Sequence, residues 1–146
     1  MARAAKQATS IAQQFVVCDD VRQETAGKVT IVGAYLGNEI LCFPAPGAKF
    51  PKGIVAILGS LALVVSFHGL GGSHDGVIEI SDPAGKLLGK SPLGKIEFDP
   101  ARTAVLMFKT NNFPVPKFGL YGVKVLIGKS AYDFSFSIKP APNAAS

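Results

Sequence analysis

The chain has 146 residues, which is enough for one domain with a sizeable hydrophobic core. Charged residues make up 17% of it and hydrophobic residues 48%, whereas average globular chains carry about 25% charged residues. So few charges cannot cover the whole surface, which favours contact between apolar surface and another subunit or a protein partner. The abundance of Gly and Ala is a plainer explanation of the same hydrophobic fraction.

The formal net charge of +5 comes with 15 Lys and Arg residues that are spread singly along the chain. Proteins that bind nucleic acids usually gather basic residues in a stripe with interleaved aromatic residues. The dispersed pattern indicates a solvated surface and predicts no nucleic-acid partner. Residues 1–14 contain Arg3 and Lys6, no acid and no continuous apolar stretch, so they do not read as a secretory signal. We therefore expect a cytoplasmic or virion-internal location.

In chain order, short runs of β-forming residues alternate with turn signals. The predicted strands are residues 15–18, 29–35, 38–43, 54–67, 77–81, 86–89, 104–109, 121–127 and 132–138. Segments 19–27, 68–76, 96–102 and 111–117 are polar or rich in Gly and Pro, and are predicted loops. Residues 82–85, Asp-Pro-Ala-Gly, carry residue types that a type I turn favours at its first, second and fourth positions.

The run of residues 54–67 is the most apolar part of the chain. It contains no charge, and the uncharged interval extends from Gly53 to His74. A membrane-spanning helix needs about 20 apolar residues, and this run is shorter and is interrupted by Gly59. A strand buried on both faces fits better, or two strands with a kink at Gly59. We expect no membrane insertion.

The last two predicted strands form a β-hairpin. Apolar and polar residues alternate with a period of two, through Tyr121, Val123, Val125 and Ile127 and then through Tyr132, Phe134, Phe136 and Ile138. A short Gly-containing segment, residues 128–130, joins them. Tyr121 follows Gly119-Leu120 just before the penultimate strand, as does the tyrosine that pins β-sandwich corners, although a plain core aromatic is the alternative.

These elements predict an all-β fold, a two-sheet antiparallel β-sandwich of Ig-like or jelly-roll-like type with eight to nine strands. The predicted β-sandwich domain covers residues 14–139, with an N-terminal arm at 1–13 and a C-terminal tail at 140–146. Cys18 and Cys42 lie in apolar strand-like runs without metal-ligand spacing, so we expect two buried free thiols. A disulfide between them would require adjacent strands, which the sequence leaves open.

No constellation of residues predicts catalysis, and no cofactor motif is present. The candidates for a metal site are His68, His74 and Asp75, which surround a glycine cluster and could hold zinc or another divalent ion. Their spacing matches no known ligand pattern, so a solvent-exposed loop is the favoured interpretation. Asp19 and Asp20 could bind a cation, but adjacent strand residues point to opposite faces, and we expect Asp20 to structure the following turn.

Several segments resemble a widespread family of small bacterial and phage-associated domains of unknown function. Residues 15–21 (FVVCDDV) and 27–35 (GKVTIVGAY) resemble the opening strand, polar loop and second strand of this family. Residues 74–85 resemble its central hairpin, with Asp82-Pro83 where the family usually has two acids, and residues 119–121 resemble its Gly-x-Tyr strand. The resemblance covers roughly residues 14–139. It implies the fold and no activity.

The leading expectation is a non-enzymatic structural or assembly protein that acts through surface contacts, such as a subunit of a phage or another particle. Its partners would be other proteins or further copies of the chain. One alternative is a soluble β-sandwich module that binds a small ligand or a carbohydrate through its loops. The other is a metal-binding protein that uses residues 68–75.

Overall fold

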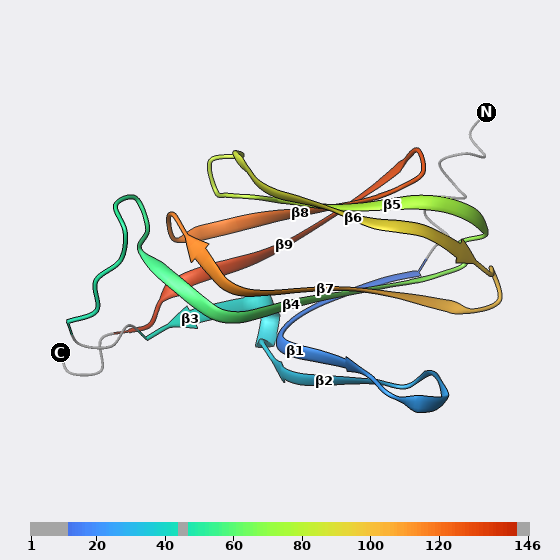
Figure 1. The fold of residues 1–146 in the computed structure, drawn as a ribbon, viewed down its shortest axis with the longest axis horizontal. Helices are drawn as coiled ribbons and strands as arrows, with labels where there is room; N and C mark the ends of the chain where they lie inside the picture. Colours follow the sequence, from blue (N-terminus) through green and yellow to red (C-terminus); the bar gives the residue numbers. More distant parts are fainter. Residues whose placement is uncertain (1–11, 44–46, 143–146) are drawn as a thin grey trace.

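The computed structural model describes residues 12–43 and 47–142, which form nine strands (Figure 1). In chain order these are β1 (Ala12–Gln23), β2 (Val29–Ala34), β3 (Glu39–Cys42), β4 (Ala56–His68), β5 (Gly72–Ser81), β6 (Leu87–Phe98), β7 (Thr103–Val115), β8 (Gly119–Ile127) and β9 (Ser130–Pro140). Short 3-10 turns, Thr25–Gly27 and Leu36–Asn38, precede β2 and β3. The described part contains no α-helix, and hence no helix long and apolar enough to cross a membrane.

The strands form two sheets, in the orders β2-β1-β4-β7 and β3-β9-β8-β5-β6. The expected β-sandwich is confirmed, and the neighbours β4-β7 and β9-β8-β5 follow the B-E and G-F-C arrangement of immunoglobulin-type sandwiches. The expectation of purely antiparallel sheets is wrong at one place, because β3 pairs with β9 in parallel from Glu39↔Ser137 to Cys42↔Pro140. The chain leaves the first sheet after β2 and enters the second beside β9, where it runs in the same direction.

The core lies between the inner faces of the two sheets. Its least exposed large side chains are Val17, Ile40, Leu61, Leu63, Val65, Phe67, Val115, Tyr121, Val123, Phe136 and Ile138. The alternation predicted for the final hairpin is confirmed: Ile127 pairs with Ser130 across the turn, and the alternate apolar residues of both strands face this core. The corner function predicted for Tyr121 is also confirmed, because its hydroxyl donates to the carbonyl oxygen of Lys117 at 2.6 Å.

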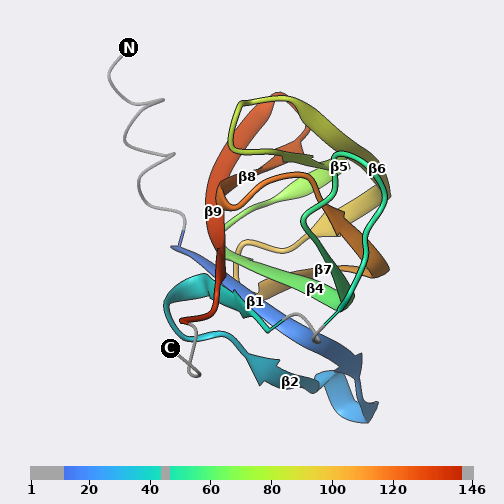
Figure 2. The same cartoon turned by 90° about the vertical axis from the view of Figure 1, so that its left-hand side faces the viewer.

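A small third layer covers part of the first sheet. The first half of β1 pairs with β4, and its second half turns away and pairs with β2. The resulting β1–β2 hairpin lies on the side of β4 and β7 that faces away from the second sheet (Figures 1 and 2). A second apolar cluster fills this contact: Cys18, Val21, Ala62 and Val64, with Val16, Val29 and Met107 against them.

Strand β4 is buried on both faces along only part of its length. Residues 61–65 are all buried, because the core lies on one side and the hairpin on the other. Pairing with β7 is interrupted at Gly59, opposite Asn112, which has φ 55°. Along the chain the core-facing residues change there from even to odd numbers: Ala56 and Leu58 join the core before Gly59 while Ile57 is exposed, and Leu61 and Leu63 join it afterwards. The kink predicted at Gly59 is therefore present within one strand, and burial on both faces is wrong before it.

Four predicted loops are partly strands. Residues 19–23 continue β1, residues 72–76 begin β5, residues 96–98 end β6, and residues 111–115 end β7. Pro114 in the predicted loop 111–117 misled the prediction, because proline lacks the N–H that a central strand needs. Pro114 lies in β7 at the edge of a sheet, where an unpaired side tolerates it, and Pro92 occupies the edge strand β6 in the same way.

The turn predicted at residues 82–85 is confirmed. The amide of Gly85 donates to the carbonyl oxygen of Asp82 at 2.9 Å, and the Asp82 carboxylate accepts from the amides of Ala84 and Lys86. Of the arm predicted at 1–13, residues 1–11 lie outside the described residues and Ala12 already begins β1. Of the tail at 140–146, Pro140 ends β9 and residues 143–146 lie outside the described part.

Candidate functional site

A groove of about 580 Å³ lies between β3 of one sheet and the start of β4 in the other. We call it the β3–β4 groove. It is lined by Asp19, Tyr35, residues 40–43, Phe50, residues 55–60 and Phe118. Consecutive residues of a strand project alternately to its two faces. Because unbroken stretches of both strands line the groove, each strand faces it edge-on.

Within residues 12–43 and 47–142, the edge of β4 in this groove has no neighbouring strand. β1 pairs with β4 from Ala12↔His68 to Cys18↔Ala62 and no further. Cys18 already pairs with Ala34 of β2, and β1 follows β2 from there. Residues 56–61 of β4 therefore have β7 on one side and the groove on the other. No strand of the described part pairs with the backbone donors and acceptors along that side.

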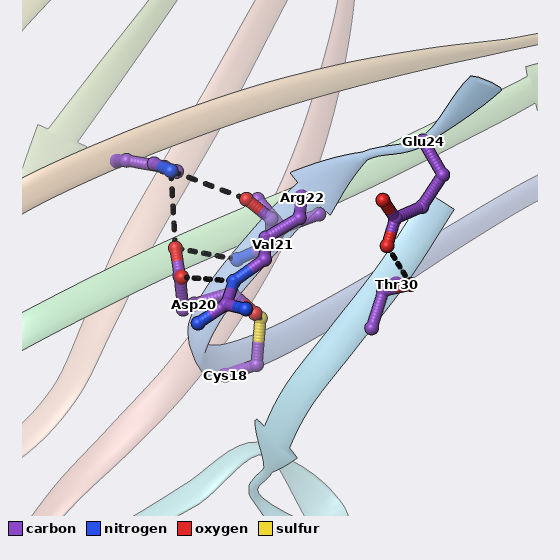
Figure 3. Close-up of polar contacts among 7 residues, drawn as sticks. Cys18, Asp20, Val21, Arg22, Glu24 and Thr30 are labelled. Atoms are coloured by element: carbon purple, nitrogen blue, oxygen red, sulfur yellow. Dashed lines mark hydrogen bonds and ion pairs between the residues drawn. The ribbon is translucent and has the colours of Figure 1, made fainter. Parts of the chain in front are cut away.

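Asp20 holds β1 in its bend (Figure 3). Its carboxylate oxygens lie 3.1 Å from Lys109 Nζ on β7 and 3.2 Å from Arg22 Nε, and it accepts the amide of Val21 at 2.9 Å. Lys109 Nζ also donates to the carbonyl oxygen of Val21 at 3.2 Å. The hydrogen bonds from Lys109 and Arg22 hold the pKa of Asp20 below its ordinary value. One lysine of β7 thus fixes both the carboxylate and the backbone of the turning strand.

Asp19 points to the other side, as expected for neighbouring residues in a strand, and lines the end of the groove. Its carboxylate accepts a hydrogen bond of 2.6 Å from the Tyr35 hydroxyl. Burial, and then this contact with a carboxylate, raise the pKa of Tyr35 above its ordinary value, so the hydroxyl stays a donor. Gly33, with φ 65°, lies against Asp19, where a Cβ atom would collide with the carboxylate.

Exposed apolar side chains gather in the groove. The exposed fractions are 77% for Phe43, 40% for Leu41, 39% for Val55 and 43% for Ile57. All four residues line the groove, Leu41 and Phe43 in or next to β3 and Val55 and Ile57 in or next to β4, so they come from different sheets. Apolar patches rimmed by polar groups mark contact surfaces for proteins or ligands more often than ordinary surface does. The groove therefore offers apolar contacts together with unpaired backbone groups.

The residues predicted for a metal site do not converge. His68 lies at the end of β4, with Nδ1 3.1 Å from the Thr103 hydroxyl oxygen. His74 and Asp75 lie in β5 instead of a loop, and His74 Nε2 lies 2.9 Å from the carbonyl oxygen of Gly71. A carbonyl only accepts, so Nε2 carries the hydrogen and is not available as a metal ligand. The described residues contain no group of three or more His, Cys, Asp or Glu side chains that could hold a metal ion.

The two cysteines are free and buried, as predicted. Cys18 lies at the bend of β1, where its Sγ is 3.7 Å from the carbonyl oxygen of Ala62. Burial, and then the neighbouring carboxylates of Asp19 and Asp20, raise the pKa of the Cys18 thiol. Burial raises the pKa of Cys42 as well. Both thiols are therefore poor nucleophiles, and they serve as small apolar side chains.

A second cavity, of about 300 Å³, opens on the opposite side of the sandwich between β6 and β7. Its lining is largely apolar and includes Ile78, Ile80, Phe108 and Phe113, with Lys90 and Ser91 at β6. Its volume is at the lower end of the range of about 300–1,000 Å³ that small-molecule sites occupy. With this largely apolar lining, the cavity suits a small apolar ligand.

Sequence reasoning missed the β3–β4 groove. A signal was present, because the uncharged interval from Gly53 to His74 is longer than the part of β4 that the hairpin and core bury. Only the pairing of β4 with its neighbouring strands shows that the first half of β4 has an unpaired edge.

A family model described as "Family of unknown function (DUF6941)" matches residues 13–133. The chain belongs to this family. The predicted resemblance to a family of unknown function is thereby confirmed, and the matched residues include both strands that form the groove.

The comparison with curated proteins found no match. Among solved structures, similar chains include the β-glucosidase from Listeria innocua, with a TM-score of 0.41 and 11% identity over 91% of this chain and 17% of that one. Another is the β-D-glucoside glucohydrolase from Trichoderma reesei, with a TM-score of 0.39 and 12% identity over 88% of this chain and 18% of that one. The chain thus spans less than a fifth of either enzyme's length. Similarity of this degree has no bearing on activity.

Proposed function

We propose that this protein is a non-enzymatic structural or assembly protein that acts through surface contacts, in a setting such as a phage or another particle. The observation that carries the proposal is the β3–β4 groove, where an unpaired strand edge and exposed apolar side chains coincide. Strand edges of this kind bind further polypeptide through backbone hydrogen bonds, while side-chain pockets add selectivity. The low share of charged residues, 17%, agrees with a surface that is partly covered in use.

The proposal is tested by sedimentation velocity of the full chain over a series of rising concentrations. We expect the sedimentation coefficient to increase with concentration, because an apolar edge that works in assembly binds further copies or a partner segment. A chain that stays strictly monomeric at the highest concentration would contradict an assembly function.

A second candidate function is the binding of a small apolar ligand, favoured by the cavity between β6 and β7. Its test is the fluorescence of 1-anilinonaphthalene-8-sulfonate with the native protein. We expect saturable binding that the variant Ser91→Trp abolishes, since the indole would fill the cavity. Equal binding by the variant, or none by the unaltered protein, would exclude this candidate. The metal-binding alternative has no supporting geometry among the described residues.

A further inference from the structure

We infer that the unpaired edge of β4, residues 56–61, pairs in an antiparallel direction with the same edge of a second copy. Strands β7 and β4 of one copy and β4 and β7 of the other would then lie side by side in one sheet across the dimer, while the β1–β2 hairpin of each copy stays outside this contact. This inference rests on the proposed assembly function and names its contact surface. The interface is isologous, since both copies contribute the same residues.

The β4 edge lacks the features that protect the other edges of this molecule. Strand β6 carries two lysines and Pro92, and β7 carries one lysine and Pro114. β3 carries the ion pair between Glu39 and Lys139, at 2.7 Å, and pairing along β2 is interrupted at Gly33. Charges, prolines and irregularities of this kind keep natural edge strands from pairing with other chains. Residues 56–61 contain neither a charge nor a proline.

The sequence of β4 is that of a strand covered on both faces, yet the fold covers only its second half. Val64, on the outer face, is 6% exposed because the β1–β2 hairpin lies over it. Val55 and Ile57 also face away from the core, and nothing in the described part of the chain covers them to this degree. The edge of a second copy would extend the sheet there and bury these side chains.

The edge is complementary to itself in shape. Antiparallel pairing about Ile57 places Ile57 opposite its counterpart and Val55 opposite Gly59. Opposed apolar side chains stabilise antiparallel pairs. A Cβ atom at Gly59 would meet nothing within 4 Å, so there is room for the branched side chain of Val55. The fold limits the pairing at both ends. At one end β1 bends at Asp19. At the other end is a turn in which the Ile54 amide donates to the Pro51 carbonyl oxygen at 3.0 Å.

The edge is also complementary to itself in charge. Asp19 lies beside the Ser60 end of the edge, where both residues line the groove. Lys52 lies just before the opposite end and is exposed. Antiparallel pairing brings the Asp19 end of each copy to the Lys52 end of the other. Complementary charges of this kind fix register and orientation more than they add affinity.

The first experiment is sedimentation velocity of the unaltered protein, Ile57→Lys and the matched control Leu87→Lys, which places the same charge on an exposed residue of the β6 edge. We expect a concentration-dependent dimer for the unaltered protein and the control, and a monomer for Ile57→Lys. If the unaltered protein dimerises and Ile57→Lys dimerises equally well, this inference is overturned and the assembly function stands. If the unaltered protein stays monomeric, both fail.

The second experiment tests the register and does not depend on a destabilising charge. Facing residues of an antiparallel pair have Cα atoms about 4.5–5.5 Å apart, within the range of about 4.4–6.8 Å that disulfides span. Under oxidising conditions Ile57→Cys should therefore yield a covalent dimer on a non-reducing gel, while Leu87→Cys should not. The two native thiols are buried and do not compete. Equal cross-linking of both variants, or none of Ile57→Cys, would contradict the pairing.

Discussion

Asp20 holds the path of β1 just after Cys18, the last residue of the strand that pairs with β4. Its carboxylate contacts Lys109 and Arg22, and Lys109 also donates to the backbone of Val21. These contacts help to keep the groove open, because a β1 that continued straight would cover the β4 edge. The bend is thus stabilised by an ion pair and a hydrogen bond between β1 and β7.

Replacing Asp20 should make the free energy of unfolding depend less on pH in the acidic range. Its folded-state pKa is depressed by Lys109 and Arg22, below an unfolded value of about 3.9. The stability that it contributes is therefore present above that value and is lost as the pH falls through the folded-state pKa. We expect Asp20→Asn to lower the urea midpoint at neutral pH and to converge with the unaltered protein at acidic pH. The exposed Asp133→Asn serves as control, and an equal loss in both would contradict the assignment.

Tyr121 fixes the corner before β8 through one hydrogen bond. Its ring stacks on Phe136 with centroids 5.5 Å apart, and its hydroxyl donates to the carbonyl oxygen of Lys117. Tyr121→Phe keeps the ring and removes only the hydroxyl, so we expect a loss of about 1 kcal/mol in the free energy of unfolding. Urea denaturation measures it. Tyr132→Phe is the control, since the Tyr132 hydroxyl makes no hydrogen bond within the described part of the chain. An equal loss of stability in this control would contradict the assignment of the Tyr121 hydrogen bond as the stabilising contact.

At the scale of elements, the β1–β2 hairpin is a separate layer held by few side chains. Val64 lies under it, whereas Val105 lies on the same outer face and is 37% exposed. Val64→Ala should cost about 1–2 kcal/mol of stability for the apolar surface lost, and it should speed amide hydrogen exchange in β2 more than in β8, because the hairpin opens locally. Val105→Ala should do neither. Uniform acceleration in both strands would indicate that the hairpin is not an independent layer.

The sequence predicted those elements whose pattern is local. The hairpin of β8 and β9 alternates without a break, since its neighbours bury one face along its whole length. The turn at Asp82 and the corner at Tyr121 also depend on residues close in the chain. The bend of β1 depends on Lys109, which is far from Asp20 in sequence, and the length of β7 depends on its place at the sheet edge. The groove results from that bend, so no local pattern could place it.

At the scale of the whole molecule, charge and apolar surface oppose each other. Each copy carries a formal charge of +5, so two copies repel at long range, whereas the edge proposed to join them is uncharged. Salt shortens the range of repulsion, with a Debye length of about 10 Å at 0.1 M and about 3 Å at 1 M. Hydrophobic contact and backbone pairing are not weakened in this way. The balance should therefore shift towards association as salt is added.

We expect the dimer to become a few-fold tighter between low and high sodium chloride, measured by sedimentation equilibrium. The variant Lys129→Glu lowers the formal charge of each copy from +5 to +3. Lys129 lies in the turn between β8 and β9, and the groove-lining strand β3 pairs with the opposite end of β9. This variant should associate more tightly at low salt and respond less to added salt. Lys129→Gln should lie between the two. If salt weakens the dimer instead, specific ion pairs dominate its stability, and the uncharged edge of β4 is not the main source of affinity.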